Sequence, residues 1–450
     1  MKKMKTLAAL GMALVLAAGV LAGCSTVSPG QVSKADREEA EVDPKKLEAD
    51  ISVVVPRGDY LDFMKKEVVP QFEKAYPKVT VKVEPEPDGG QLDARIAAGD
   101  APNLWVGVFG YLPAKYAKVG KLVDMDDLPG SKELFNRIDE NFIHRDYGGL
   151  YYVPWNATTQ MLIYNKDLFK KAGLDPNKPP KTFDEYLEYA KKIDALPAQD
   201  GKEVYGNTFW NNQLSSGGWY WTMLAQIYYN MNDGKYQLFN KYGTDIVFDK
   251  EQANMDEFFR FAREAQKYAP KTMDPEKQQD FFSRNTGMWI QYGYGWKTNL
   301  EQAKGKPMKI GKDVGVAPLP TMKKGQTSWS TLDGRALMIF KGDKAEEQAS
   351  WEFTKFLMKD DINLKACKEL GQLPTLKSIK DDPYFKRPET KPFVDQLEHT
   401  LPNEAFAVLD PVSNELLQTY QQVVVDRSLT PEEGVKQAAE KARKILRKEK

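Results

Sequence analysis

Cysteine and histidine are scarce in this sequence. Its 450 residues include 2 cysteines, Cys24 and Cys367, and 2 histidines, His144 and His399. Two cysteines cannot build a disulfide framework, so the folded part must be held together by its hydrophobic core. The histidines lie far apart and belong to no HExxH-type spacing, and no G-x-S-x-G segment occurs. The sequence therefore favours neither a metalloenzyme nor a serine hydrolase, and we expect no cofactor and no metal site.

An excess of charge of one sign is also absent. Lys and Arg total 64 and Asp and Glu total 64, which gives a formal net charge of +0. Without a basic excess, no broad surface for nucleic acid or another polyanion is predicted. After the first 23 residues, no apolar run reaches the roughly 20 residues that a membrane-spanning helix requires.

The N-terminal residues resemble a bacterial lipoprotein signal. Lys2, Lys3 and Lys5 precede an uncharged run at residues 7–22, and Leu-Ala-Gly-Cys stands at residues 21–24. This pattern predicts a signal peptide over residues 1–23, cleaved before Cys24, whose acyl chains, palmitate among them, anchor the protein outside a bacterial cell membrane. The alternative is an ordinary cleaved signal with an incidental cysteine. Residues 24–49 are rich in Ser, Lys, Glu, Asp and Pro, which is typical of a flexible tether.

Strand and helix patterns alternate after residue 50. Residues 51–55, 79–83 and 104–109 are predicted strands, and stripes that include Phe72 and Ile96 predict helices between them. This order indicates a parallel sheet with helices packed on it. Because a chain of this length exceeds what one core usually serves, we expect an α/β protein with two lobes.

Residues 148–193 carry the most specific pattern, GGLYYVPWNATTQMLIYNKDLFKKAGLDPNKPPKTFDEYLEYAKKI. Within it, residues 160–164 predict a buried strand, Asn165 can cap a short helix, and Thr182 with Glu185 forms a capping box. The stretch resembles the central signature of the carbohydrate-type extracellular solute-binding proteins, family 1, which serve ABC importers and include maltose-binding protein. FEKAYPKVTVKVE, LDARIAAGDAPNLW and DVGVAPLP, the last at residues 313–320, are also similar to that family.

The resemblance implies a two-lobed periplasmic-binding-protein-like fold of type II, with discontinuous lobes joined by hinge strands. Lobe one would comprise residues 50–157 and 320–372, and lobe two residues 158–319 and 373–450, with residues 313–320 crossing back to lobe one. It also implies a monomeric extracytoplasmic lipoprotein without catalytic activity, which captures a sugar or oligosaccharide by hinge closure and delivers it to an ABC permease. Three alternatives stay open: a secreted glycan-active enzyme, a binder of a non-sugar solute on this fold, and a sensing or scaffolding lipoprotein.

A sugar cleft needs aromatic faces for C–H groups and polar side chains for hydroxyls. Tryptophans cluster beside polar residues at 210–221, 289–296 and 329–335. Trp221 follows the apolar face of a helix and is expected in the core, whereas Trp219 in the first turn is a candidate for ligand contact. The family's pattern ends in a stacking tryptophan at Trp296, which makes this residue the strongest candidate.

Other candidates follow from chain position. Trp155 and Asn156 come directly before the expected crossing and should lie at the cleft floor, and the loops after the first three strands should face the cleft because ligands bind at the carboxyl ends of parallel strands. Arg57 or Arg335 could instead mark an acidic sugar, since guanidinium pairs with carboxylate. The candidate set is Arg57, Asp59, Asp88, Phe109, Trp155, Asn156, Trp210, Asn212, Trp219, Tyr292, Trp296, Trp329, Asp333 and Arg335.

Overall fold

The described part of the chain is built on two β-sheets. The computed structural model describes residues 42–87, 90–145, 148–210, 218–271, 273, 281–303 and 306–448, and both sheets belong to one unit, Glu41–Lys450. The predicted signal peptide, Cys24, Asp88 and Asn212 lie outside the described residues, as does the side chain of Trp219.

The first sheet has seven strands: β1 (Ala49–Val55), β2 (Val79–Pro85), β3 (Leu104–Val108), β4 (Val153–Thr158), β9 (Ser330–Ile339), β10 (Leu373–Pro374) and β11 (Thr400–Pro402). Their order is β10-β4-β9-β3-β1-β2, and β11 pairs with the first residues of β9. Strand β1 runs parallel to β2 and β3, which confirms the parallel unit expected from the sequence. Strand β9 runs antiparallel to both β3 and β4.

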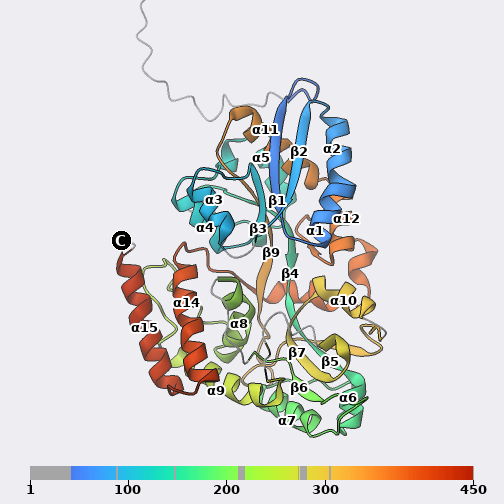
Figure 1. The fold of residues 1–450 in the computed structure, drawn as a ribbon, viewed down its shortest axis with the longest axis vertical. Coiled ribbons are helices and arrows are strands. Elements are labelled where there is room, and N and C mark those ends of the chain that lie inside the picture. Colours follow the sequence, from blue (N-terminus) through green and yellow to red (C-terminus); the bar gives the residue numbers. More distant parts are fainter. Residues whose placement is uncertain are drawn as a thin grey trace, which may run out of the picture. The chain divides into compact units, whose positions relative to one another are not determined.

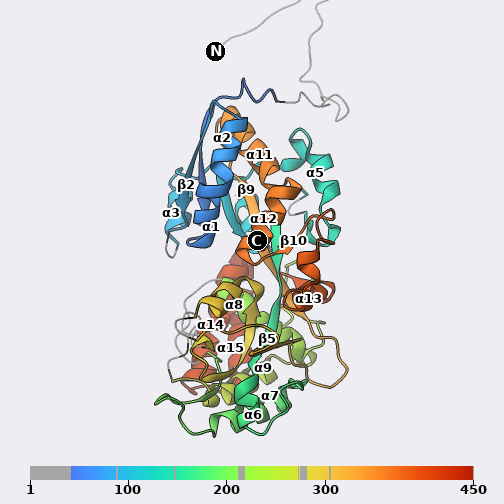
Figure 2. The same cartoon turned by 90° about the vertical axis from the view of Figure 1, so that its right-hand side faces the viewer.

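Helices from both ends of the chain cover this sheet: α1 (Asp59–Phe63), α2 (Val69–Ala75), α3 (Gln91–Ala97), α4 (Tyr111–Lys118), α5 (Ser131–Arg137), α11 (Lys344–Leu357) and α12 (Asp360–Leu370). Helix α11 lies against β1 and β9, and α12 against β4 and β10 (Figures 1 and 2). A π-helical turn, Met64–Val68, precedes Pro70, which has no N–H to donate to the turn before it. Cys367 on α12 is fully buried, as expected.

The second sheet has four strands: β5 (Gln160–Asn165), β6 (Tyr205–Asn207), β7 (Thr286–Gly293) and β8 (Val314–Ala317), in the order β6-β7-β5-β8. The sequence prediction for residues 313–320 was wrong, because β8 is an edge strand of this sheet and pairs with β5. Strand β9 instead runs back through the first sheet, over residues 330–339. Both segments are short apolar runs, and only their non-local pairing distinguishes them.

The second sheet and the C-terminal region carry the remaining helices: α6 (Lys166–Lys171), α7 (Phe183–Asp194), α8 (Gly218–Met231), α9 (Met255–Ala265), α10 (Lys297–Gln302), α13 (Lys391–Asp395), α14 (Leu409–Tyr420) and α15 (Pro431–Lys448). The predicted caps are confirmed. The Asn165 Oδ1 accepts from the backbone N–H of Asp167 at 3.0 Å, and the Thr182 Oγ1 accepts from that of Glu185 at 3.2 Å. Helices α14 and α15 lie side by side (Figure 1).

Gly206 lets helix α7 lie directly on strand β6. A Cβ atom at this position would overlap the backbone carbonyl of Ala190, and backbone cannot move aside as a side chain can. We therefore expect Gly206→Ala to lower the free energy of unfolding by about 2–3 kcal/mol, within the range for overpacked cores. In Gly342→Ala, the control, the new Cβ first meets the flexible end of Glu346 at 3.3 Å. Urea unfolding curves measure both, and equal stabilities would contradict this explanation.

Candidate ligand-binding site

Four polar side chains share one face where β4 and β9 run side by side. In the antiparallel register, Asn156 is opposite Arg335 and Thr158 is opposite Asp333. Residues directly opposite each other in such a pair project to the same face. We call Asn156, Thr158, Asp333 and Arg335 the polar quartet. Three of its members were predicted from the sequence, whereas Thr158 was missed.

Two members of the polar quartet have hydrogen-bonding groups that the described protein leaves unpaired. Asn156 is fully buried, and among the described residues neither its Nδ2 nor its Oδ1 has a hydrogen-bond partner. The Oγ1 of Thr158 is buried and equally unpaired within the described part of the chain. An unsatisfied buried polar group costs about 1–3 kcal/mol. These atoms are therefore suited to a partner that brings its own donors and acceptors, as a ligand with hydroxyl groups does.

Arg335 belongs to a stack of side chains from three elements. Its guanidinium lies 5.1 Å from the centroid of the Tyr60 ring, which comes from α1. That ring meets Trp155 of β4 edge to face, with the centroids 5.9 Å apart and an interplanar angle of 67°. Trp155 is fully buried behind Tyr60. Sequence analysis missed Tyr60, because nothing local separates it from other tyrosines at a helix start.

Burial and neighbouring groups act in opposite directions on the pKa values of Asp333 and Arg335. Burial raises the pKa of Asp333, while Arg335 and the N–H of Gly334, which donates to Oδ1 at 2.7 Å, act in the opposite direction. Burial alone would lower the pKa of Arg335, but Tyr60, Asp333 and Glu86 outweigh it and the net shift is upward. The guanidinium therefore remains charged at neutral pH.

The loops after β1, β2 and β3 border this region. Arg57 is exposed and its Nε donates to the backbone oxygen of Glu86 at 2.8 Å. Phe109 is buried, its ring 5.8 Å from that of Tyr152. Burial raises the pKa of Glu86 despite nearby Arg335. Glu86 was not predicted, although it lies in the same loop as the candidate Asp88.

Asp59 marks the opening between α1 and α10. It lines a cavity of about 1060 Å³ together with Thr298 and residues of the second sheet region, and a smaller one of about 260 Å³ with Phe63, Thr298 and Glu369. The polar quartet lines neither cavity. Within the quartet, Asn156 and Asp333 are buried, whereas Thr158 and Arg335 are partly exposed.

The aromatic candidates near the second sheet differ in how deeply their side chains are buried. Trp210 is fully buried, and its backbone oxygen accepts from the Tyr420 hydroxyl at 2.8 Å. Tyr292 is also fully buried, and its hydroxyl has no partner among the described residues. Trp296 is half-buried, with its ring 5.7 Å from that of Trp289.

Trp329 is fixed through its backbone. Its N–H donates to the Asn230 Oδ1 at 2.9 Å, and its carbonyl accepts from the Asn230 Nδ2 at 2.6 Å. The indole lies 6.2 Å from the His399 ring. Trp329 directly precedes β9, whereas Asp333 and Arg335 lie within that strand.

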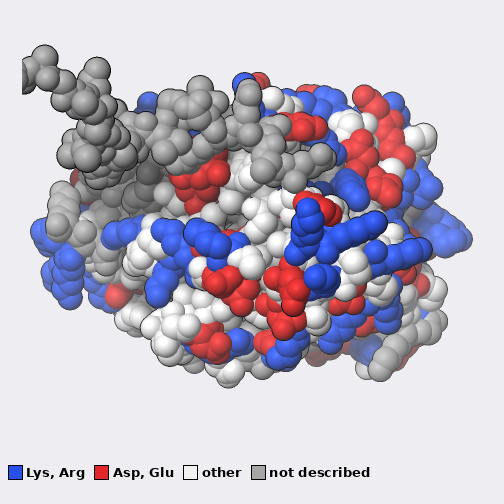
Figure 3. Space-filling model, turned by 90° about the horizontal axis from the view of Figure 1, so that it is seen from above, with Lys and Arg blue, Asp and Glu red and all other residues white. Residues whose placement is uncertain are grey.

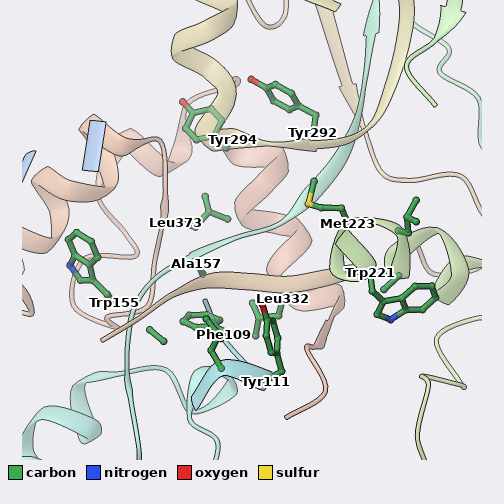
Figure 4. Close-up of a cluster of buried hydrophobic side chains, with 14 of the residues drawn as sticks. Phe109, Tyr111, Trp155, Ala157, Trp221, Met223, Tyr292, Tyr294, Leu332 and Leu373 are labelled. Carbon is green, nitrogen blue, oxygen red and sulfur yellow. The ribbon is translucent and has the colours of Figure 1, made fainter. Parts of the chain in front are cut away.

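Figure 4 shows how the buried groups are distributed around these strands. Phe109, Tyr111 and Leu332 lie together on one side of Ala157, whereas Tyr292 and Tyr294 lie beyond Leu373 on the other, and Trp221 stands apart near Met223. Strand pairing brings Asn156, Asp333 and Arg335 together, and the Phe109 ring lies against Gly334 between the latter two. The structure does not bring Trp210 and Trp329 into that group.

A comparison with known protein families identifies the family to which this chain is related. Residues 58–363 match the family described as bacterial extracellular solute-binding protein. The chain belongs to this family. The predicted relationship is thereby confirmed, and the family and the similar proteins below are described as binding proteins rather than enzymes.

Several curated relatives are similar over part of their length. The sn-glycerol-3-phosphate-binding periplasmic protein UgpB of Brucella melitensis is 29% identical over 273 residues, 58% of this chain and 56% of that protein. The maltotriose-binding protein of Pyrococcus abyssi is 27% identical, covering 69% and 63%. The diacetylchitobiose binding protein DasA of Streptomyces coelicolor is 24% identical, covering 84% of each. The chain thus spans little more than half the length of the first of these relatives.

Solved structures of similar proteins have the same fold. Maltose-bound MalE3 of T. maritima has a TM-score of 0.73 at 24% identity, covering 88% of this chain and 100% of that one. The cyclic alpha-maltosyl-1,6-maltose binding protein of Arthrobacter globiformis has a TM-score of 0.71 at 19% identity, covering 89% and 100%. The predicted two-lobed α/β fold is therefore confirmed for this family member.

Three further features bear on the type of site. Within the described ranges, no helix combines the length and apolar character needed to cross a membrane. The same residues contain no group of three or more His, Cys, Asp or Glu side chains placed to hold a metal ion. On the face in Figure 3, Lys and Arg side chains are interspersed with Asp and Glu rather than gathered into a patch of one sign.

Proposed function

We propose that this family member captures a sugar or oligosaccharide between its lobes, without chemical turnover, and delivers it to the permease of an ABC importer. The observation that carries the proposal is the polar quartet, in which the buried Asn156 amide and Thr158 hydroxyl have no partner in the described protein. Sugar hydroxyls donate and accept, so they can satisfy such groups. The names of the maltotriose-binding and diacetylchitobiose-binding relatives support a saccharide.

The proposed lobes are those expected from the sequence, residues 50–157 with 320–372 and residues 158–319 with 373–450. In support, β1 to β4 and β9 belong to one sheet and β5 to β8 to the other, while β10 and β11, from residues 373–450, pair with the first sheet at β4 and β9. The chain passes directly from β4, which ends at Thr158, to β5, which begins at Gln160. Residues 157–160 are thus the shortest link between the two sheets and the natural place for a hinge.

The two proposed lobes also meet at Gly371 and Gly295, and hinge closure would change this contact. Gly371 ends α12 with a φ of 61°, and a Cβ there would lie 3.0 Å from the Tyr294 carbonyl oxygen and 3.1 Å from the Gly295 Cα. A side chain at Gly371 would meet this backbone closer than ordinary van der Waals contact, and the positive φ at this position also favours glycine. A ligand that binds the closed form better raises its population by the difference in affinity for the two forms.

The location and partners are also part of the proposal. Processing before Cys24 would leave a diacylated or triacylated cysteine, and two or more chains anchor a protein stably at a membrane. The lipid-anchored monomer would then present its closed form to the permease. Mass spectrometry of the membrane fraction tests this, since the expected N-terminal peptide begins with a lipid-modified Cys24, and an unmodified one would contradict it.

Ligand-dependent stabilisation tests the binding function. A saccharide at 100 times its dissociation constant should raise the free energy of unfolding by about 2.7 kcal/mol, which is visible as a shift of Tm in a screen of neutral and acidic oligosaccharides. We expect Trp296→Ala to abolish the shift and to leave the unliganded Tm nearly unchanged, because the side chain is only half-buried.

Two outcomes would count against this proposal. An equal loss of unliganded stability would place Trp296 in the core rather than at the ligand. Steady release of reducing ends from an oligosaccharide by the purified protein would indicate an enzyme instead of a binder.

A further inference from the structure

Polar side chains converge on the place where Gly293 of β7 lacks a side chain. A Cβ atom built on Gly293 would lie 3.2 Å from the Thr158 Oγ1, 3.7 Å from the Gln160 Nε2 and 3.8 Å from the Gln160 Oε1, and these are its three nearest neighbours. We call this position, with the two side chains beside it, the Gly293 recess. Thr158 ends β4 of the first sheet and Gln160 begins β5 of the second, so the recess is bordered by both sheets.

The backbone does not require a glycine at this position. Gly293 has a φ of −95° and a ψ of 150°, which are extended values that any residue adopts. The atoms nearest to it are the ends of side chains, which can move, whereas a Cβ at Gly206 would meet backbone. Of the three residues that form the recess, Thr158 alone is partly exposed. The missing side chain therefore leaves space that a group from outside the protein can take.

Gln160 is fixed through its backbone but leaves one side-chain atom unpaired. Its N–H donates to the Ser330 Oγ of β9 at 2.7 Å, and the residue is 3% exposed. Its Nε2 lies 3.7 Å from the Met223 Sδ, a weak acceptor. The Oε1 has no hydrogen-bond partner among the described residues. Because an unsatisfied buried acceptor is costly, this atom is suited to a donor that a ligand supplies.

The two unpaired groups of the recess accept different partners. The Gln160 Oε1 can only accept a hydrogen bond, whereas the Thr158 hydroxyl can donate one or accept one. A ligand hydroxyl can donate to the first and accept from the second at the same time. An ether or carbonyl oxygen only accepts, so it would leave the Gln160 Oε1 unpaired.

We infer that the Gly293 recess receives one hydroxyl group of the ligand, and that Gln160 and Gly293 determine specificity for a saccharide that has a hydroxyl at this point. The inference rests on the proposed function and deepens it, because it extends the ligand contacts from the polar quartet to the second sheet. Thr158 belongs to both groups, so one hydroxyl held there contacts a side chain from each sheet.

Filling the recess tests the inference. Calorimetric titration with maltotriose, mannotriose and diacetylchitobiose first identifies the saccharide that binds most tightly. We expect Gly293→Ala to weaken its binding at least about 10-fold and to leave the Tm of the unliganded protein nearly unchanged, because alanine fits the extended backbone. Gly342→Ala is the matched control, since its Cβ first meets the Glu346 Oε2 at a similar 3.3 Å, and it should bind as the wild-type protein does.

Removing the unpaired acceptor is the second test. Gln160→Met keeps the length of the side chain and lacks the Oε1, and it should weaken binding of the same saccharide about 10-fold. Monodeoxy analogues of that saccharide then identify the hydroxyl. One analogue should bind about 10-fold more weakly than its parent to the wild-type protein and equally well as its parent to Gln160→Met, whereas the losses for the other positions should be the same in both proteins.

Gln226→Met controls for a structural role of the amide. Gln226 is fully buried, but its Nε2 donates to the Met223 carbonyl at 2.8 Å and its Oε1 accepts from the Thr331 hydroxyl at 3.1 Å. Its replacement should lower the Tm of the unliganded protein, and Gln160→Met should not. An equal fall of Tm in both variants would make Gln160 a structural residue and overturn the inference.

The remaining outcomes separate the two proposals. Wild-type affinity in Gly293→Ala, or losses for every deoxy analogue that are unchanged in Gln160→Met, would overturn the assignment of the recess while the capture of saccharides stands. Failure of every probe to bind to the wild-type protein would overturn the proposed function, and the assignment with it.

Discussion

Asn156→Leu is expected to weaken saccharide binding about 10- to 100-fold, or about 1.4–2.8 kcal/mol, without lowering the stability of the unliganded protein. Leucine branches at Cγ as asparagine does but cannot hydrogen-bond. Because the Asn156 amide has no partner among the described residues, the folded protein loses no bond and is relieved of an unsatisfied buried group. Calorimetric titration with the tightest saccharide and urea unfolding measure the two effects.

Asn207→Leu is the matched control. Asn207 is as fully buried as Asn156, but its Nδ2 donates to the Ala265 carbonyl at 3.0 Å and its Oδ1 accepts from the Phe209 N–H at 2.7 Å. Leucine would leave both backbone groups unpaired, at a cost of about 2–4 kcal/mol in stability. If Asn156→Leu destabilised the unliganded protein as much as Asn207→Leu, its amide would be structural.

The second large effect is a dependence of stability on pH through Glu404. This residue follows β11 and is buried, and its carboxyl oxygens accept from the backbone N–H groups of Phe239 at 2.8 Å and Leu238 at 3.0 Å. Burial raises its pKa from 4.5 to about 8, although the two N–H donors act against the shift. Glu404 therefore stays protonated in the folded protein at neutral pH.

The sign of the effect follows from proton binding in the two states. Below pH 4.5 the group is protonated in both states and contributes nothing to the pH dependence. Between pH 4.5 and about 8 the unfolded chain has lost the proton and the folded chain retains it, so stability falls as pH rises. Above that window the loss is complete.

Each pH unit within the window corresponds to about 1.4 kcal/mol, so Glu404 should lower the free energy of unfolding by about 3 kcal/mol between pH 5.5 and pH 8.5. In Glu404→Gln this contribution is absent, and the decline over the same range should be smaller by that amount. Urea unfolding of both proteins at the two pH values measures the difference. Identical declines would mean that Glu404 is ionised in the folded protein at neutral pH.

The parts of the fold that depend on local signals could be predicted from the sequence. Asn165 and Thr182 cap helices as expected because the capping oxygen and its N–H partner are only two or three residues apart. The parallel unit of β1, β2 and β3 was likewise visible in alternating strand and helix patterns. The crossing strand was misplaced at residues 313–320, since the choice between β8 and β9 depends on partners more than a hundred residues away.

The site could be predicted only in part, for a related reason. Asn156 was nominated because it borders the expected crossing, and Asp333 and Arg335 because they follow Trp329; strand pairing brings the three together. Tyr60 and Glu86 follow β1 and β2, and their proximity to Arg335 on β9 depends on the strand order β9-β3-β1-β2, which no local pattern reveals. The search for tryptophans led to Trp155 and Trp210, both fully buried, because a large apolar ring fills a core as readily as it lines a cleft.

A crystal structure of the protein with its tightest-binding neutral oligosaccharide tests the central claim most directly. We expect sugar hydroxyls within about 3.2 Å of the Asn156 amide and the Thr158 hydroxyl, with the saccharide held between the two lobes. A saccharide seated elsewhere, for example in the cavity between Asp59 and Pro307, with the Asn156 side chain still unpaired, would contradict the account.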